Sequence, residues 1–300
     1  MVVTEKAYAK INLGLKILRK RDDGYHDILS LFQTVHVHDT LYISDKETPG
    51  LESSGPDVPQ GEDNLILRAE KVFTAFLGIN TRAHFQLNKR IPLGAGLGGG
   101  SADAAAALRG LRRFYHAHSL SVTAMEEMSA KLGSDVPFLL KGGTAAVTGR
   151  GERIAPIDWP FDFTYVIVYP GFAVSTEWAY RSLKGFSGNS DSFFGMIGQL
   201  QAGTLRKDEL FRVLVNDFES IVLPEYPVLG EIKTGMLAQG ARASLLTGSG
   251  SSMVGIFENE HEACRCAGKF RNEQWSVFTV KASPPLLFET FAAPGNCSGD

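Results

Sequence analysis

The feature that most constrains this chain is a glycine-rich segment at residues 92–101, with the sequence PLGAGLGGGS. Five of the seven positions from Gly94 to Gly100 are glycine, and an alanine-rich run at 102–111 follows directly. Alanine is the strongest helix former, so this run predicts a helix that begins where the glycines end. A helix N-terminus offers unpaired N–H groups and partial positive charge, and glycines let an anion approach the backbone closely. The segment therefore predicts a phosphate-binding loop.

Two other phosphate-binding loops fit this segment less well. A P-loop requires a lysine before its Ser or Thr, and none is present here. The pattern G-x-G-x-x-G does match at Gly94, Gly96 and Gly99, but Lys89 and Arg90 precede it where a dinucleotide fold has a hydrophobic strand. The region about 20 residues further on is helix or loop, without the acidic residue expected at a strand end. A nicotinamide-dependent oxidoreductase therefore remains only as an alternative.

Composition excludes several classes of protein. The formal net charge of -3 over 300 residues gives no reason to expect a nucleic-acid partner. No run approaches the roughly 20 apolar residues of a membrane helix, and charged residues interrupt the first twenty positions, so we expect a cytoplasmic protein without a membrane partner. Three cysteines are too few for a disulfide framework. His36 and His38 lack an evident third ligand, so no metal site is predicted.

Hydrophobic periodicity predicts mixed strands and helices rather than regular βαβ units. Strands are expected at residues 6–18, 35–43, 83–89, 164–169, 245–246, 253–257 and 276–281. Helices are expected at 64–77, 102–111, 122–132 (capped by Gly133), 210–223 and 228–239. Loops are expected at 45–62 and 184–192, and a disordered tail at 292–300. This order predicts an α+β fold in two domains, 1–158 with the ATP site and 159–300 on the substrate side.

Five segments in a fixed order resemble the GHMP kinases, the family of galactokinase and of homoserine, mevalonate and phosphomevalonate kinases. These segments are AKINL at 9–13, GYH at 24–26 followed by LFQ at 31–33, GLGGGSAD at 96–103, GSDVPF at 133–138 and LTGSGS at 246–251. The resemblance implies an N-terminal domain like the second domain of ribosomal protein S5 and a C-terminal ferredoxin-like domain. The three consecutive glycines and the GYH segment are similar to the branch of the family that acts on a cytidyl substrate.

The resemblance also implies a reaction and its participants. ATP, with Mg²⁺ bridging its phosphates, would give its γ-phosphoryl group to a small molecule that carries cytidine diphosphate. The acceptor would be the 2-hydroxyl of diphosphocytidyl-methylerythritol, in the non-mevalonate isoprenoid pathway. Another GHMP kinase that uses a different alcohol remains open, as does a silent nucleotide-binding or RNA-binding module on an S5-like fold. The sequence leaves the oligomeric state open.

Two residues would carry the catalysis. Lys10 lies on the polar face of its strand and would orient the attacking hydroxyl and stabilise phosphoryl charge, although a strand lysine can simply be solvated. Asp135 would accept the hydroxyl proton, although it can also cap the helix that begins with Val136 and Pro137. Asp103, in the first turn of the alanine-rich helix, suits the helix dipole whatever the function.

The remaining predicted site residues bind the two substrates. ATP would contact Asn64, Pro92, Leu93, Gly94, Ala95, Gly96, Leu97, Gly98, Gly99, Gly100, Ser101 and Ala102. The cytidyl substrate would contact Asn12, Tyr25, His26, Thr176, Tyr180, Gly248 and Ser249. Aromatic faces stack on a base, and backbone at a Gly/Ser turn can approach phosphate. For Asn64 a helix N-cap is the alternative, for Tyr180 a core aromatic, and for Gly248 a tight hairpin.

Overall fold

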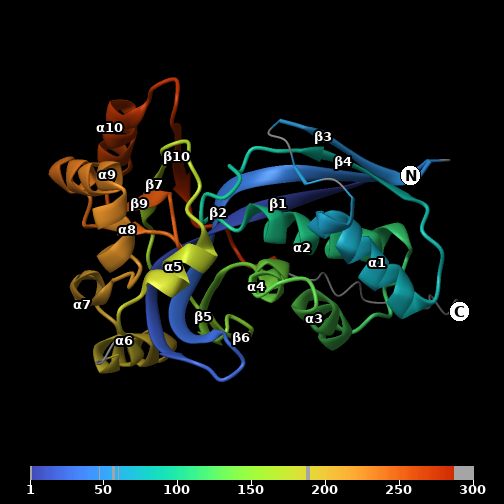
Figure 1. Cartoon of the computed structure of the whole chain (residues 1–300), viewed down its shortest axis with the longest axis horizontal. Helices are drawn as coiled ribbons and strands as arrows, with labels where there is room; N and C mark the ends of the chain where they lie inside the picture. Colours follow the sequence, from blue (N-terminus) through green and yellow to red (C-terminus); the bar gives the residue numbers. More distant parts are fainter. Residues whose placement is uncertain (1, 47, 56–57, 60, 187–189, 287–300) are drawn as a thin grey trace, which may run out of the picture.

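A computed structural model describes residues 2–46, 48–55, 58–59, 61–186 and 190–286, and it contains two β-sheets side by side (Figure 1). The first sheet has the order β3-β4-β2-β5-β6, with β1 paired to β2. Its strands are β1 (Val2–Lys20), β2 (His26–Asp45), β3 (Gly50–Ser54), β4 (Ala83–Asn88), β5 (Thr144–Gly149) and β6 (Arg153–Ile157). The second sheet has the order β10-β7-β9-β8. Its strands are β7 (Thr164–Tyr169), β8 (Ala243–Leu246), β9 (Met253–Phe257) and β10 (Ser276–Lys281).

The long antiparallel hairpin of β1 and β2 connects the parts of the molecule. Both strands run well beyond the predicted 6–18 and 35–43. The second strand, β2, is long enough to pair with β4 at one end and with β5 at the other. A turn that includes Gly24, which has a positive φ, joins the two strands, and Arg21 there donates to the carboxylates of Asp23 and Asp27. The register of β1 against β2 shifts between Asn12 and Leu15, which leaves room for another segment to pair there.

Four helices cover one face of the first sheet (Figure 1). They are α1 (Leu65–Leu77), α2 (Gly99–Phe114), α3 (Val122–Ala130) and α4 (Val136–Lys141). The alanines of α2 are buried against β1, where small side chains let helix and strand approach closely. Helix α3 ends with Lys131 as its C-cap, so the predicted cap at Gly133 is wrong by two positions. The chain after Lys131 instead turns into α4, which brings Asp135 beside Lys10 of β1.

The second sheet is covered by helices on one face and joins the first sheet's core on the other. The helices of this half are α5 (Thr176–Ser182), α6 (Asp191–Gln201), α7 (Lys207–Val213), α8 (Glu219–Glu225), α9 (Pro227–Ala238) and α10 (Glu260–Phe270). Leu229, Ile232 and Ala263 pack on the outer face with Val166 and Val168. Side chains of the other face, including those of β7 and β9, belong to one hydrophobic core with the first sheet. The domain division after residue 158 stays a prediction.

Two further sequence predictions are corrected by the fold. The loop expected at 45–62 contains the edge strand β3, which pairs in parallel with β4. The helix expected at 210–223 is two helices, α7 and α8, because residues 214–218 leave the helical path and bond to β1. Of the loop expected at 184–192, residues 187–189 lie outside the described residues and the last two begin α6. The tail at 292–300 also lies outside them.

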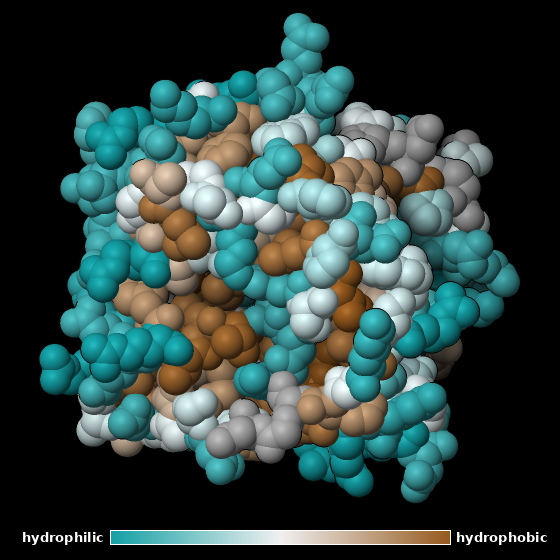
Figure 2. Space-filling view, turned by 60° about the vertical axis from the view of Figure 1, so that its left-hand side comes forward, coloured by the Kyte–Doolittle hydropathy of each residue, from teal (hydrophilic) through white to brown (hydrophobic). Residues whose placement is uncertain are grey.

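The surface is polar for the most part. Figure 2 shows apolar side chains gathered in the middle of one face, with hydrophilic side chains around them. Across the described residues, no helix has both the length and the apolar content needed to cross a membrane. The rings of His36 and His38 both pack against Tyr8, and no group of three His, Cys, Asp or Glu side chains among the described residues could hold a metal.

Candidate active site

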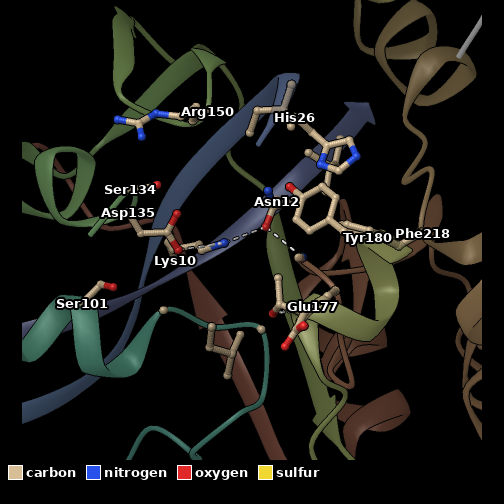
Figure 3. A pocket seen from close by; sticks show the side chains of 18 of the residues that line it. Lys10, Asn12, His26, Ser101, Ser134, Asp135, Arg150, Glu177, Tyr180 and Phe218 are labelled. Atoms are coloured by element: carbon tan, nitrogen blue, oxygen red, sulfur yellow. Dashed lines mark hydrogen bonds and ion pairs between the residues drawn. The ribbon is translucent and has the colours of Figure 1, made fainter. Parts of the chain in front are cut away.

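A cavity of about 930 Å³ lies where β1, the glycine segment, α4 and α5 meet. Its lining brings together most of the residues predicted from the sequence. These are Lys10, Asn12, Tyr25, His26, Pro92, Leu93, Gly94, Ala95, Gly96, Leu97, Gly98, Gly99, Gly100, Ser101, Asp135, Thr176, Tyr180, Gly248 and Ser249. Figure 3 shows Lys10 and Asp135 pointing toward each other, with Ser101 of α2 on one side and His26 and Tyr180 on the other.

Lys10 is the central cation of the cavity. Its Nζ lies 3.5 Å from Asp135 Oδ2 and donates to Asn12 Oδ1 at 2.9 Å. The ammonium also lies 4.6 Å from the centre of the Phe32 ring, a cation–π distance that stabilises charge in a partly dry site. Lys10 is only 5% exposed, so it is not the solvated strand lysine of the alternative interpretation. The polar face of β1 is buried at both Lys10 and Asn12.

Asp135 stands at the start of α4 without capping it. Its backbone is in the right-handed helical region, and its side chain makes no capping hydrogen bond. Pro137 in the first turn needs no N–H partner, so the helix start requires less capping than most. The carboxylate is therefore available to the cavity, where it faces Lys10 and remains partly exposed. This geometry removes the cap as the explanation for an aspartate at this position.

The glycine segment wraps around β1 and leads directly into α2. The amide of Lys10 donates to the Leu97 carbonyl at 3.0 Å, which fixes the segment against the strand. Gly96 has a φ of +77°, and a Cβ there would clash with the Thr247 carbonyl oxygen, so only glycine fits. Because α2 begins at Gly99, its first N–H groups and its dipole face the cavity. An arrangement of this kind suits the binding of phosphate.

A buried ionic cluster anchors the glycine segment from below. Lys89 Nζ contacts Oδ2 of both Asp39 and Asp103, at 2.5 and 2.7 Å. Asp39 Oδ1 also accepts from the Ile91 amide at 2.8 Å, so the cluster fixes the chain where it enters the segment. Burial raises the pKa of the Asp103 carboxyl to about 8, with Asp39 adding to the effect and Lys89 opposing it. Asp103 is thus a core residue, and because α2 begins at Gly99 it lies beyond the first turn in which it was predicted.

A second glycine-containing turn, residues 247–250, forms the opposite wall. Asn12 Oδ1 accepts from the Gly248 amide at 2.9 Å, and the Asn12 amide donates to Thr247 Oγ1 at 3.0 Å. The hydroxyls of Thr176 and Ser249 are 2.8 Å apart, which ties α5 to the turn. The turn therefore does more than reverse the chain between β8 and β9, since it holds Asn12 of β1 and Thr176 of α5 at the cavity.

Aromatic side chains form the far end of the cavity. The His26 ring stacks on Tyr180 at a centroid distance of 4.5 Å, and Phe218 packs edge-on against Tyr180 at 4.9 Å. Burial and the charge of Lys20 lower the pKa of His26, which keeps the imidazole neutral near pH 7. Burial and the charge of Asp135 raise the pKa of Tyr180 to about 12, so its phenol stays neutral. Neutral rings of this kind can stack on a pyrimidine and bond to its edge.

Two predicted residues lie outside the cavity lining. Asn64 caps α1, since its Oδ1 accepts from the Ile66 amide at 2.8 Å and its Nδ2 donates to the Pro59 carbonyl at 2.9 Å. Its neighbour Leu65 lines the cavity instead. Ala102 is buried in the core of the first sheet. The cap alternative for Asn64 describes its observed contacts, and the contact of either residue with ATP stays a prediction.

Several lining residues were not predicted from the sequence. Phe218, Arg150, Glu177 and Arg181 are the main examples. Arg150 lies 4.8 Å above the Tyr25 ring, and its position between two glycines in the β5–β6 turn was a signal for it. Phe218 had no local signal, because it reaches the cavity only through the pairing of residues 215–217 with β1.

Comparison with known proteins shows which family this chain matches. The family descriptions "GHMP kinases N terminal domain" and "GHMP kinases C terminal" match residues 64–143 and 199–276. A 4-diphosphocytidyl-2-C-methyl-D-erythritol kinase of Thermodesulfovibrio yellowstonii is 37% identical over 292 residues, which cover 95% of this chain and 100% of that protein. A kinase of the same name from Prosthecochloris aestuarii is 37% identical over 279 residues, covering 92% and 96% of the two chains.

Solved structures agree in fold. A crystal structure of 4-(cytidine 5'-diphospho)-2C-methyl-D-erythritol kinase has a TM-score of 0.76 and 32% identity, over 93% of this chain and 100% of that one. Homoserine kinase from Cytophaga hutchinsonii has a TM-score of 0.74 over 95% of each chain at 18% identity, which shows the fold alone. The predicted α+β fold of GHMP kinases is confirmed. This chain is a small-molecule kinase that belongs to the GHMP kinases and, within them, to the 4-diphosphocytidyl-2-C-methyl-D-erythritol kinases.

Proposed function

We propose that this kinase transfers the γ-phosphoryl group of ATP to the 2-hydroxyl of 4-diphosphocytidyl-2-C-methyl-D-erythritol, in the non-mevalonate isoprenoid pathway. The names of its relatives and the GYH segment at 24–26 support this acceptor. The cavity supports the chemistry, since it has a phosphate site at one end and an aromatic site at the other. The observation that carries the proposal is the Lys10–Asp135 pair at 3.5 Å between these two ends.

The pair has the functional groups that phosphoryl transfer requires. The acceptor hydroxyl passes its proton to the Asp135 carboxylate while its oxygen forms a bond to the γ-phosphorus. The bond from that phosphorus to the bridging oxygen breaks, and the oxygen leaves with ADP. The Lys10 ammonium stabilises charge on the transferring group, and Asn12 holds that ammonium in place. The N–H groups at the start of α2 hold the other phosphates.

The donor groups of the cavity fit a Mg²⁺ that arrives with the nucleotide. Mg²⁺ keeps several waters and is bound through one or two carboxylates and substrate phosphates, rather than by an all-protein cage. The cavity lining carries two carboxylates, Asp135 beside Lys10 and Glu177 of α5, together with the hydroxyls of Ser101 and Ser134. When bound, the ion would neutralise charge on the phosphate oxygens. We propose that Ser101 and Asp135 contact it directly or through its waters.

The test of the proposed function is an ADP-release assay with ATP and Mg²⁺. The acceptor panel is 4-diphosphocytidyl-2-C-methyl-D-erythritol, homoserine, mevalonate and galactose, with a reaction without acceptor as control. We expect release above the control only with the cytidyl acceptor. Release with another member of the panel would replace the acceptor and remove the base-binding role of Tyr25 and His26. Equal release in all reactions, control included, would contradict acceptor phosphorylation altogether.

A further inference from the structure

The short segment between α7 and α8, residues 214–218, bonds to β1 next to the candidate active site. The Leu15 amide donates to the Val215 carbonyl at 2.7 Å, and the Asp217 amide donates to the Leu15 carbonyl at 2.9 Å. Asp217 Oδ2 also accepts from the Ile17 amide at 2.7 Å. The segment therefore adds a short parallel pairing to β1 beside the register shift after Asn12. It fixes the part of β1 that follows Lys10 and Asn12.

Asn216, in the middle of this segment, turns its side chain toward the 247–250 turn. Its Nδ2 donates to the Leu246 carbonyl at 2.7 Å and to the Gly248 carbonyl at 2.8 Å. Its Oδ1 accepts from the Phe218 amide at 3.0 Å. The residue is 4% exposed, and its bonds to Leu246 and Phe218 are buried while its bond to Gly248 is partly buried. A buried amide with every polar group used in this way specifies one arrangement of its partners.

The Gly248 residue is thereby held from both sides. Its N–H donates to Asn12 Oδ1 and its carbonyl accepts from Asn216 Nδ2, and these two asparagines are distant in the sequence. Gly248 has a φ of +58°, which few residues other than glycine adopt. Because glycine also adopts many other backbone conformations, the turn has little local preference for this shape. Contacts from elsewhere in the fold must therefore hold it.

We propose that Asn216 is a positioning residue that holds the Gly248 peptide at the cavity wall and Phe218 beneath the aromatic end. Asn216 touches neither substrate. It links the 247–250 turn, beside Lys10 and Asn12, with Phe218, which packs against Tyr180. One side chain thus positions the cavity wall on both sides of the bound acceptor. This inference rests on the proposed function, since it assigns the residue to the acceptor half of that reaction.

The test compares two substitutions at this position with a matched control. Asn216→Ala leaves two carbonyls and one amide without their partner, and Asn216→Asp places a carboxylate against the same two carbonyls. We expect kcat/KM for the cytidyl acceptor to fall about 10-fold for the first and about 100-fold for the second. KM for ATP should stay within about 3-fold, because the side-chain hydrogen bonds of Asn216 end on Leu246, Gly248 and Phe218 and not on the segment before α2. Hydrogen exchange at the 247–250 amides should accelerate in both.

Asn259→Ala is the control. The Asn259 side chain accepts from the amides of His261 and Glu262 at the start of α10, and it does not line the cavity. Its replacement by alanine therefore also removes side-chain hydrogen bonds to the backbone. We expect a loss of thermal stability without a change in kcat/KM. The contrast separates a general loss of stability from a misplaced turn, and all assays are run well below the melting temperature of the variant.

Each outcome is informative. Folded Asn216 variants with kinetic constants equal to those of the wild type would overturn the proposal, as would equal losses for the acceptor and for ATP. If neither variant folds, Asn216→Ser keeps a donor at shorter reach and is measured in their place. If this variant also fails to fold, the role is structural and the proposal is wrong. A wild-type enzyme inactive on every acceptor would instead contradict the proposed function and not this inference.

Discussion

Two glycine-rich segments face each other across β1, and they obtain their shapes in different ways. Residues 94–100 run into α2, so the helix that follows them sets their direction and their charge. Residues 247–250 join two short strands and obtain their position from Asn12, Thr176 and Asn216. A motif that builds its own site can be recognised locally, whereas the second segment acquires its role only when distant elements fold around it.

Lys10 and Asn12 lie between the two segments and contact both. The Lys10 amide bonds to the first segment and the Asn12 side chain bonds to the second. Lys10 and Asn12 are thus placed by contacts with both segments together. Substitutions can show whether the two segments act as one site or as two.

The largest effect is expected where the two sides meet. Asp135→Ala should lower kcat about 10²- to 10⁴-fold, since it removes the group that accepts the proton, and ATP affinity should change little. Lys10→Ala should have an effect of similar size through the lost charge stabilisation. The measurement is steady-state kinetics with nucleotide affinity from calorimetry. Lys6→Ala, an exposed lysine of the same strand, is the control. A normal rate for Asp135→Ala would remove it from the mechanism.

The contact between the segments is tested at Gly96. An alanine there combines a left-handed backbone with a clash against the Thr247 carbonyl, at a cost of about 2–4 kcal/mol in unfolding free energy. Gly198→Ala in α6 meets no atom within 4 Å and should stabilise by about 0.5–1 kcal/mol. Denaturant unfolding measures both. Equal stability of Gly96→Ala and the wild type would mean that the two segments do not pack together.

Separate effects on KM for ATP and on KM for the acceptor sharpen the comparison of the two sides of the cavity. Gly99→Val should raise KM for ATP, because a side chain there crowds Ile91 and Lys89 and blocks the approach of phosphate. Tyr180→Ala should raise KM for the cytidyl acceptor about 5- to 100-fold through lost stacking, with KM for ATP unchanged. Tyr226→Ala, which truncates a stacked tyrosine outside the lining, is the control. If either variant changed both KM values alike, the two ends of the cavity would not be separate sites.

Taken per pH unit, the smallest effect on stability concerns the cluster of Lys89, Asp39 and Asp103 under the first segment. Asp103 has a pKa of about 8 when folded, against about 4 when unfolded. Between these values the folded protein keeps a proton that the unfolded chain has lost. Stability should therefore fall as pH rises from about 4 to 8, by at most about 1.4 kcal/mol per unit, and level off above. Asp103→Asn should remove this part of the slope in unfolding measured from pH 5 to 9. An identical slope would show that other groups cause it.

The parts that sequence predicted are those with local causes. Alternation predicted β1, and the helix-forming runs predicted α1 and α2, because each pattern depends on neighbours in the chain. The core position of Asp103 was missed, since it depends on Asp39 and Lys89 reaching the same point. Phe218 and Asn216 were missed for the same reason, because their place depends on pairing with a strand about 200 residues earlier.

The central claim is that the γ-phosphoryl group of ATP ends on the acceptor's 2-hydroxyl. Phosphorus NMR of a reaction with ATP and 4-diphosphocytidyl-2-C-methyl-D-erythritol tests it most directly. The account predicts one new phosphomonoester signal on the acceptor, equal in amount to the ADP formed, with the cytidyl diphosphate signals retained. ADP accompanied only by inorganic phosphate, or a phosphate on any other oxygen of the acceptor, would contradict it.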